Sequence, residues 1–178
     1  MLVRHTLTVT PVGELMLVAS DDVLTGVYFE GHHPAPKPSD LGVWVSPADS
    51  TLSVAADQIH EFLAGERTGF SLLIDFPKAG FRSRVWEQLM RIPYAEVSTY
   101  KALAASLGNP HAYRAVGTAV ANNPLSIVVP CHRVIAADGS LSGYAGGVER
   151  KRHLLQMEYS VAKRLGLKDD EPDLFSGF

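Results

Sequence analysis

Residues 98–122 of the 178-residue chain read STYKALAASLGNPHAYRAVGTAVAN. Ser98 is a candidate N-cap for a short helix that Gly108 closes. Pro110 can begin a second helix that continues to about Asn122. Two short helices joined by a Gly-Asn-Pro turn predict a helix-turn-helix, although a plain helical hairpin in a bundle shows the same pattern.

The second of these helices is built from small residues, with Arg114 as its only long cation. The small residues are Ala112, Ala115, Gly117, Thr118, Ala119 and Ala121. A glycine inside a helix costs about 1 kcal/mol relative to alanine. Close approach of this helix to a partner would explain that cost.

The rest of the second half shows helical periodicity at both ends and a β-branched run between them. Proline stops this run, and Cys131 follows at once, so we expect the cysteine at a strand exit. The predicted elements are a helix over 81–90, a strand over 125–129, a glycine-rich loop over 141–147 and a basic-fronted helix over 149–158.

The first half combines strand-like and helical patterns. Apolar runs over 13–19 and 23–29 flank a polar turn and predict a hairpin. Over 50–63 the apolar residues recur every three or four positions, which predicts an amphipathic helix, and 72–76 is a candidate strand. The fold class is therefore α+β.

The chain divides into four expected segments. These are a small N-terminal strand-plus-helix domain over 1–76, a linker over 77–80, a mainly helical C-terminal domain with the helix-turn-helix over 81–164, and an acidic tail over 165–178. Charge follows this order: residues 1–80 hold four Lys/Arg against ten Asp/Glu, residues 81–164 hold eleven against five, and the tail is net −3. The basic segment could face a polyanion, although ordinary solvated surface also allows such asymmetry.

The composition is that of a folded protein, with 46% hydrophobic and 20% charged residues. Cys131 is the single cysteine, so neither an internal disulfide nor a cysteine-based zinc ribbon can form. No run approaches the roughly eighteen apolar residues of a membrane span, and the start does not resemble a signal peptide. We expect a cytoplasmic protein that uses no membrane, metal or cofactor.

Cys131 itself allows more than one interpretation. A lone cysteine is more often a buried small hydrophobe than a nucleophile. A thiol reacts as its thiolate, and His132, Arg133 and Lys151 could each lower its pKa if the fold brings them near. These residue types, together with a carboxylate, also permit a cysteine hydrolase with turnover.

The run Pro130-Cys131-His132-Arg133-Val134 resembles the active-site signature of the O6-alkylguanine-DNA alkyltransferases, also called methylated-DNA–protein-cysteine methyltransferases. The resemblance is close across 81–158 and weaker across 1–76. Further stretches that match the family in order and spacing are Phe81 to Trp86, Ile92-Pro93-Tyr94, Tyr100, Arg114-Ala115-Val116-Gly117, Asn123-Pro124, Gly143-Tyr144 with Gly146-Gly147, and Glu158.

The resemblance implies direct-reversal DNA repair, in which Cys131 takes the alkyl group from guanine O6 in one irreversible, single-turnover transfer. It implies that His132 acts through a water as the base for Cys131, that Glu158 orients His132, and that Asn123 braces the site. The implied partner is double-stranded DNA containing O6-alkylguanine. A monomer in solution is expected, and cooperative binding on DNA is left open.

The same resemblance assigns the DNA contacts. Tyr100 helps rotate the target nucleotide out of the duplex, and Arg114 fills the vacated space; such base flipping costs a few kcal/mol. The small-residue helix, with Ala115, Gly117 and Thr118, is expected to enter the minor groove, whose readout of sequence is degenerate.

The resemblance also implies a pocket for the alkyl group. The backbone carbonyls of Cys131 and Val134 should read the amino edge of the guanine, and Tyr144 and its glycine-rich loop should wall the pocket. The expected pocket residues are Val120, Ser126, Val134, Tyr144 and Ala145. Ala145 stands where some relatives carry Ser, and Ser126 where some carry Pro, so the tolerated alkyl size stays open.

Two features bear on alternatives to this function. Some relatives hold zinc in the N-terminal half through two cysteines, and this chain has none there, so we expect no zinc. Other relatives lack the reactive cysteine and act as non-enzymatic, damage-sensing DNA-binding proteins. Cys131 argues against that alternative without excluding an added signalling role.

Overall fold

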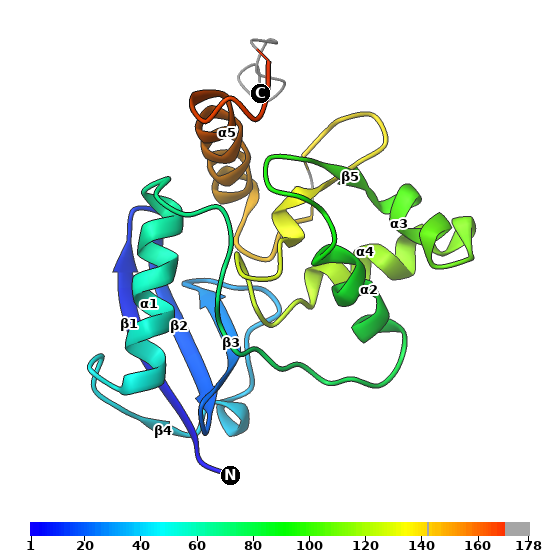
Figure 1. Ribbon diagram of the computed structural model, residues 1–178. Helices are drawn as coiled ribbons and strands as arrows, with labels where there is room; N and C mark the ends of the chain where they lie inside the picture. The colour runs from blue at the N-terminus through cyan, green and yellow to red at the C-terminus, as the bar shows by residue number, and fades with distance from the viewer. Residues whose placement is uncertain (142, 170–178) are drawn as a thin grey trace.

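The computed structural model describes residues 1–141 and 143–169. It confirms the α+β class: a sheet with one covering helix forms the N-terminal part, and short helices form most of the C-terminal part (Figure 1). Residues 170–178 of the expected acidic tail lie outside the described residues. The elements are β1 (Val3–Thr10), β2 (Gly13–Ser20), β3 (Val23–Phe29), η1 (Pro38–Asp40), β4 (Val43–Trp44), α1 (Ser50–Leu63), α2 (Phe81–Leu89), β5 (Ser98–Thr99), α3 (Tyr100–Ser106), η2 (Pro110–Ala112), α4 (Tyr113–Ala121), η3 (Cys131–Arg133), β6 (Val134–Ile135) and α5 (Val148–Arg164).

The N-terminal sheet has the strand order β3-β2-β1-β4. The predicted hairpin is confirmed as β2 and β3, which pair antiparallel with Leu15 opposite Phe29 and Leu17 opposite Val27. β1, which the sequence analysis did not predict, pairs antiparallel with β2, and the short β4 pairs parallel with β1. Leu15 and Leu17 alternate along β2 and are fully buried, as expected for a strand with one face on the core.

α1 confirms the helix predicted over 50–63 and covers one face of this sheet (Figure 1). Its buried residues include Leu52, Ile59 and Phe62, spaced as an amphipathic helix requires. The carboxylate of Asp49 caps the helix by accepting hydrogen bonds from the backbone nitrogens of Thr51 (3.2 Å) and Leu52 (3.1 Å).

The strand predicted over 125–129 is wrong. This segment folds into turns, in which the Val129 nitrogen donates to the Leu125 carbonyl (2.8 Å) and Ile127 has a left-handed φ of 71°. Its side chains, apolar except for Ser126, are mostly buried in the core, and of the five residues only Leu125 forms a bridge, with Val27 of β3. Cys131 therefore begins a 3-10 turn and does not follow a strand.

The segment predicted as a strand over 72–76 is also largely irregular. Only Ile74 forms a bridge, with Leu24 of β3.

The helix-turn-helix consists of α3, a turn at Gly108, the single turn η2, and α4. Ser98 is not the N-cap of α3; the hydroxyl of Thr99 is, because it accepts a hydrogen bond from the Ala102 nitrogen (3.0 Å). Ser98 instead pairs with Val134, as β5 runs parallel to β6. This pairing sets the start of α3 directly beside the turn that carries Cys131.

The two halves share one hydrophobic core. The backbone of Val27 in β3 accepts from the Ser126 nitrogen (3.1 Å) and donates to the Pro124 carbonyl (2.8 Å), so the sheet is bonded to the segment before Cys131. The division into domains at residues 77–80 stays a prediction. None of the helices within residues 1–141 and 143–169 has the length and hydrophobicity of a membrane span.

Candidate active site

Cys131 lies at the first position of η3, and its side chain is buried, with the residue 1% exposed. The side-chain amide nitrogen of Asn123 donates to its sulfur (3.0 Å) and to the Val129 carbonyl (2.9 Å). The amide oxygen of Asn123 accepts from the Leu125 nitrogen (3.0 Å). Asn123 therefore joins the end of α4, the irregular segment and the thiol.

His132 and Glu158 are brought together, although they are 26 positions apart in the chain. The Nε2 atom of His132 lies 2.5 Å from Oε1 of Glu158, and both side chains are fully buried. Arg133 approaches the same carboxylate with Nε (2.9 Å to Oε2) and Nη2 (3.0 Å to Oε1). The backbone nitrogen of Ala95 donates to Oε2 as well (3.0 Å).

These contacts fix the protonation of the pair. Burial alone would raise the pKa of Glu158, but His132 and Arg133 outweigh it and lower this pKa to about 2, so the group is a carboxylate. Burial lowers the pKa of His132, against the effect of Glu158, and keeps the ring neutral at neutral pH. A carboxylate only accepts hydrogen bonds, so Nε2 carries the proton and Nδ1 carries the lone pair.

The Nδ1 atom of His132 is buried and has no hydrogen-bond partner within the described part of the chain. A buried, unpaired acceptor is costly, and such groups are uncommon in native proteins. Because Nε2 is fixed by Glu158, Nδ1 is the atom of this ring that can take up a proton. A neutral imidazole oriented by a carboxylate has the features of a general base.

The thiol of Cys131 is protonated in the resting site. Burial raises its pKa and outweighs the hydrogen bond from Asn123 and the charge of Lys151, which both lower it. Of the three residues that could lower this pKa, Lys151 acts as a nearby charge, whereas the neutral His132 and the Arg133 guanidinium are bonded to Glu158. The sulfur therefore needs a base before it can act as a nucleophile.

Lys151 in α5 is itself buried and donates from Nζ to the carbonyl of Val134. Burial lowers its pKa to about 8, while a Cys131 thiolate would raise it. Its Nζ also lies 5.9 Å from the ring centroid of Tyr100. Lys151 therefore holds the backbone beside the thiol, and its charge lowers the pKa of Cys131.

Tyr100 precedes Cys131 in the chain and Tyr144 follows it. A Cys131 thiolate would raise the pKa of both phenols. Burial raises the pKa of Tyr100 to about 12, and a Cys131 thiolate adds to this effect. Burial also raises the pKa of Tyr144 well above its usual value, again with a contribution from Cys131. The Tyr100 hydroxyl faces Gly143, where an added Cβ would lie 3.5 Å from it.

The remaining predicted pocket residues are buried: Val120, Ser126, Val134 and Ala145. The Val134 carbonyl accepts from Lys151, and the Cys131 carbonyl accepts from the Val134 nitrogen in the 3-10 turn. Each of these carbonyls keeps a second lone pair, so both can still accept from a guanine amino group. That all of these residues line an alkyl pocket stays a prediction.

Four of the residues predicted to contact DNA lie on α4, and the fifth, Tyr100, begins α3. Arg114, Ala115 and Thr118 are exposed, and the Arg114 guanidinium lies 6.0 Å from the ring centroid of Tyr113. Gly117 is half-buried, and an added Cβ there would lie 3.8 Å from the ring of Tyr100. A Cβ at this distance would be in ordinary van der Waals contact with the ring, so α4 passes beside Tyr100 without requiring a glycine there.

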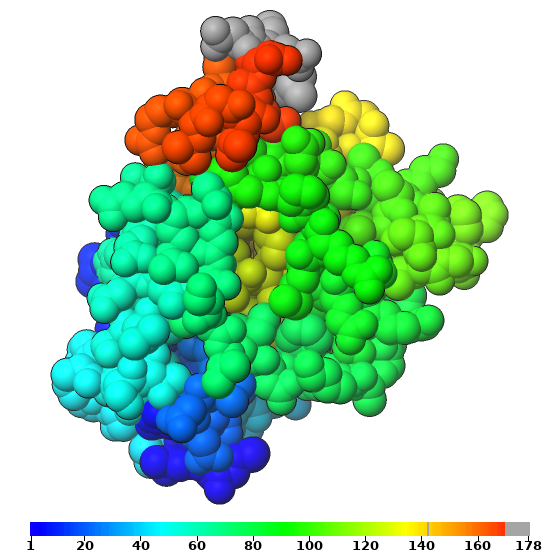
Figure 2. All heavy atoms as spheres, in the orientation of Figure 1, coloured from blue at the N-terminus to red at the C-terminus, as the bar shows by residue number. Residues whose placement is uncertain are grey.

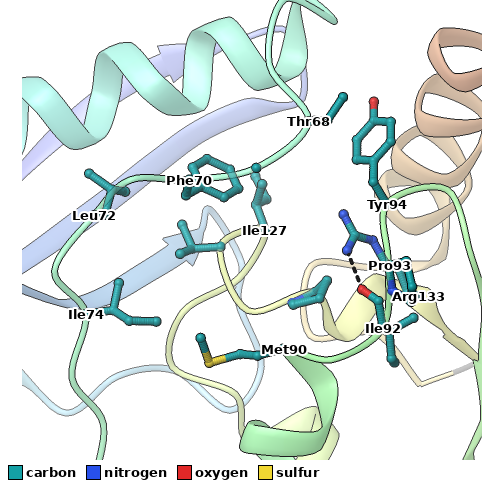
Figure 3. Close-up of a pocket in the computed structure, with 13 residues that line it drawn as sticks. Thr68, Phe70, Leu72, Ile74, Met90, Ile92, Pro93, Tyr94, Ile127 and Arg133 are labelled. Atoms are coloured by element: carbon teal, nitrogen blue, oxygen red, sulfur yellow. Dashed lines mark hydrogen bonds between the residues drawn. The ribbon is translucent and has the colours of Figure 1, made fainter. Parts of the chain in front are cut away.

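A surface hollow lies between the two halves (Figure 2). This cavity of about 340 Å³ is lined by Arg133 and by residues from three segments: Thr68, Gly69, Phe70, Leu72, Ile74, Met90, Ile92, Pro93, Tyr94, Ile127, Val128 and Pro130. Figure 3 shows Arg133 at its wall, donating from Nη1 to the carbonyl of Ile92 (2.8 Å). Cys131 and Tyr144 are not among its lining residues, so this hollow is separate from the thiol site.

Sequence reasoning did not assign Arg133 to Glu158 or Ala95 to the site. Arg133 directly follows the cysteine and histidine, which is a signal for a role, but the direction of its side chain depends on a partner 25 positions away. No local pattern marks the backbone of Ala95, whose φ of 60° turns its nitrogen toward Glu158.

A helix-turn-helix set beside a buried cysteine, with an oriented imidazole and carboxylate, defines the class of enzymes that carry out covalent cysteine chemistry on DNA. Comparison with known proteins narrows this class. The family model of the 6-O-methylguanine DNA methyltransferase DNA binding domain matches residues 80–160, and that of the 6-O-methylguanine DNA methyltransferase ribonuclease-like domain matches residues 3–76.

Relatives and solved structures agree with these matches. The methylated-DNA–protein-cysteine methyltransferase of Mycobacterium bovis is 42% identical over 153 residues, which cover 86% of this chain and 90% of that protein. The constitutive methylated-DNA–protein-cysteine methyltransferase of Bacillus subtilis is 38% identical over a match that covers 86% of this chain and 94% of that protein. The crystal structure of Mycobacterium tuberculosis OGT in complex with DNA matches with a TM-score of 0.80 and 39% identity, over 89% of this chain and 94% of that chain. The chain belongs to the 6-O-methylguanine DNA methyltransferase family.

Proposed function

We propose that this protein repairs DNA by direct reversal: Cys131 takes the alkyl group from O6-alkylguanine in double-stranded DNA in one irreversible transfer. The observation that carries the proposal is the arrangement of His132. Its Nε2 is held by Glu158, and its Nδ1 has a lone pair and no partner in the described residues. Membership of the methyltransferase family and the likeness to a structure in complex with DNA support the substrate class.

The proposed reaction balances without a cofactor. The thiol proton of Cys131 passes through a water to Nδ1 of His132, and Glu158 stabilises the imidazolium that forms. The sulfur then forms a bond to the alkyl carbon as the carbon–O6 bond breaks, and that bond's electron pair stays on the guanine. The guanine anion takes up the proton from the imidazolium, and Cys131 is left as a thioether.

The hydrogen bond from Asn123 stabilises the thiolate while it forms. A donor to an ionised group contributes more than a donor to a neutral one, about 1.5–3 kcal/mol. This donor lies 3.0 Å from the sulfur before any substrate binds, so no reorganisation is required when the charge develops.

DNA recognition is assigned to α4 and to Tyr100. Small residues on the exposed side of α4 suit the minor groove, and Arg114 can enter the base stack when a base is flipped. Tyr100 passes beside α4, since an added Cβ at Gly117 would lie 3.8 Å from its ring, and it follows β5, which pairs with β6 directly after the Cys131 turn. We propose that a monomer binds the damaged duplex, and that recognition depends on flipping of the alkylated base.

The test is a stoichiometry measurement with a duplex that contains one O6-methylguanine. The wild-type protein is expected to remove one methyl group per protein and then stop, whereas Cys131→Ala is expected to bind the duplex and remove none. Removal beyond one equivalent would indicate a hydrolase and contradict the proposal. Undiminished removal by Cys131→Ala would contradict it as well.

A further inference from the structure

Arg150, in the first turn of α5, is bonded to three separate segments of the chain. Its Nε donates to the carbonyl of Val12 (2.7 Å), and its Nη1 donates to the carbonyls of Glu30 (2.9 Å) and Gly146 (3.2 Å). Val12 lies in the turn between β1 and β2, and Glu30 follows β3. Arg150 thus joins two loops of the N-terminal sheet to the glycine-rich loop before α5.

An arginine suits these acceptors because its guanidinium presents several donors in a fixed plane, whereas lysine presents one compact ammonium group. The chain also makes room for it. At Gly13, whose φ is 107°, an added Cβ would lie 2.7 Å from Nη2 of Arg150. The Arg150 guanidinium also lies 4.9 Å from the ring centroid of Phe29, within the range of a cation–π interaction.

The N-terminal sheet contacts the glycine-rich loop in two further places. The ring of Phe29 packs so closely on Gly146 that an added Cβ there would lie 2.5 Å from it, and its centroid lies 5.9 Å from that of Tyr144. The backbone nitrogen of His33 donates to the carbonyl of Ala145 (3.1 Å). The position of residues 144–146 is therefore set by the N-terminal half as well as by the helix that follows.

This loop lies against Tyr100, the first residue of α3, which starts beside the turn that carries Cys131. An added Cβ at Gly143 would lie 3.5 Å from the Tyr100 hydroxyl. Tyr144 is buried, and a Cys131 thiolate contributes to the rise in the pKa of its hydroxyl. Under the proposed function Tyr144 walls the alkyl pocket, so a displacement of the loop changes the space left for the alkyl group. Packed interiors transmit such displacements because they contain little free volume.

We infer that Arg150 is a positioning residue that sets the size of the alkyl pocket, by fixing the loop over 143–147 to the N-terminal sheet. This gives the N-terminal half a role in substrate selection, beyond bracing the helix-turn-helix. The inference rests on the proposed function, because only an alkyl-transfer reaction makes the size of this space matter.

The test compares two arginines of the same helix. Arg150→Gln removes the tie to the loop, and Arg164→Gln removes a tie between α5 and the N-terminal half far from the thiol, where Nη2 donates to the Gly65 carbonyl (2.7 Å). Transfer rates are measured with matched duplexes that carry O6-methylguanine or O6-benzylguanine, together with thermal unfolding of each variant. The ratio of the two rates cancels losses of DNA binding and of folded protein.

Arg150→Gln is expected to raise the benzyl-to-methyl rate ratio about 10-fold over wild type, the scale on which pocket contacts discriminate between alkyl groups. Arg164→Gln is expected to lower the unfolding temperature and leave the ratio unchanged. An unchanged ratio in Arg150→Gln overturns the inference while the proposed function stands. A wild-type protein that accepts no methyl group overturns the proposed function itself.

Arg150→Lys keeps the result interpretable if Arg150→Gln does not fold. Lysine retains the charge and one donor, so part of the tie survives, and the ratio is expected to move in the same direction by a smaller factor. A folded Arg150→Lys protein with the wild-type ratio overturns the inference in the same way.

Discussion

The thiol site and the outer face of α4 differ in almost every physical respect. Cys131, His132 and Glu158 are at most 1% exposed, and hydrogen bonds of 2.5–3.2 Å hold the imidazole and the carboxylate in place. On α4, Arg114 and Thr118 are exposed, and within residues 1–141 and 143–169 neither side chain forms a hydrogen bond or ion pair with the N-terminal half.

This difference separates two tasks. Proton transfer and nucleophilic attack depend on pKa values and on donors that do not move, and a dry interior supplies both. Binding to a duplex requires a face that is open before DNA arrives, and small side chains allow the backbone of α4 to come close. Tyr100 adjoins both regions: an added Cβ at Gly117 of α4 would lie 3.8 Å from its ring, and a Cys131 thiolate contributes to its raised pKa.

The largest effect is expected from a substitution at the buried thiol site. Glu158→Gln leaves the shape of the side chain but removes the charge that orients His132 and pairs with Arg133. We expect methyl transfer from O6-methylguanine duplex to slow by about 10²-fold or more, in line with loss of general-base assistance.

Duplex affinity should be unchanged in Glu158→Gln, since Glu158 is fully buried, whereas the exposed face of α4 is proposed to bind the duplex. Glu149→Gln is the matched control, because Glu149 is an exposed carboxylate on the same helix that pairs with Arg152 (2.7 Å). Equal rates for the two variants would contradict the assigned role of Glu158.

A smaller interior effect is expected from Asn123→Ala. The variant removes the donor to the Cys131 sulfur, leaves the Leu125 nitrogen without the Asn123 acceptor, and leaves the Val129 carbonyl with the Cys131 nitrogen as its donor. We expect about 10-fold slower transfer and a free energy of unfolding lower by about 1–3 kcal/mol. Stopped-flow transfer and urea unfolding measure the two effects, and Asn122→Ala on the exposed side of the same turn is the control. A rate loss without any loss of stability would argue against the bracing role.

The outer face is tested with Arg114→Ala and two substrates. With duplex DNA we expect about 10-fold slower transfer, because the vacated space in the stack is no longer filled and base flipping costs a few kcal/mol. With free O6-methylguanine base the rate should equal that of wild type. Arg67→Ala, at a half-buried arginine of the N-terminal half that pairs with Glu61 (2.8 Å), is the control for a general loss of charge. Equal losses on both substrates would place Arg114 in the chemistry and break the comparison.

The smallest expected effect concerns pH and stability. The folded pKa values of His132 and Glu158 are both lowered, the latter to about 2, so the unfolded chain binds more protons in acid. Stability from His132 is full above its unfolded pKa of about 6.5 and falls below it, and stability from Glu158 is lost between about 4.5 and 2. Urea unfolding between pH 7 and pH 4 should show this decline, with a shallower slope below pH 4.5 for Glu158→Gln. A flat profile would contradict these pKa directions.

Elements whose form depends on residues close together in the sequence were predicted correctly, and those held by contacts between distant residues were not. The helix over 50–63 follows from its own apolar spacing, and the hairpin over 13–29 from two apolar runs across a polar turn, so both predictions are confirmed. The segment over 125–129 has a β-branched composition, but it is buried among both halves and paired with only one residue of β3, Val27. A short apolar run does not distinguish a strand from a buried turn.

The site shows the same limit. Resemblance pointed to Cys131, His132, Asn123 and Glu158, and the structure brings them together in two hydrogen-bonded pairs. The resemblance could not give the protonation state of the Cys131 thiol, which depends on burial. Nor could it give the tie from Arg150 to Val12, since 138 positions separate the two residues. Such contacts arise only when the whole chain is folded.

The most direct test of the account is the location of the transferred group. Wild-type protein is incubated with an O6-methylguanine duplex, digested, and analysed by peptide mass spectrometry. We predict one added methyl group, on the peptide that contains Cys131, and none on Cys131→Ala protein treated in the same way. A methyl group on any other residue, or restored guanine with an unmodified Cys131, would contradict the central claim.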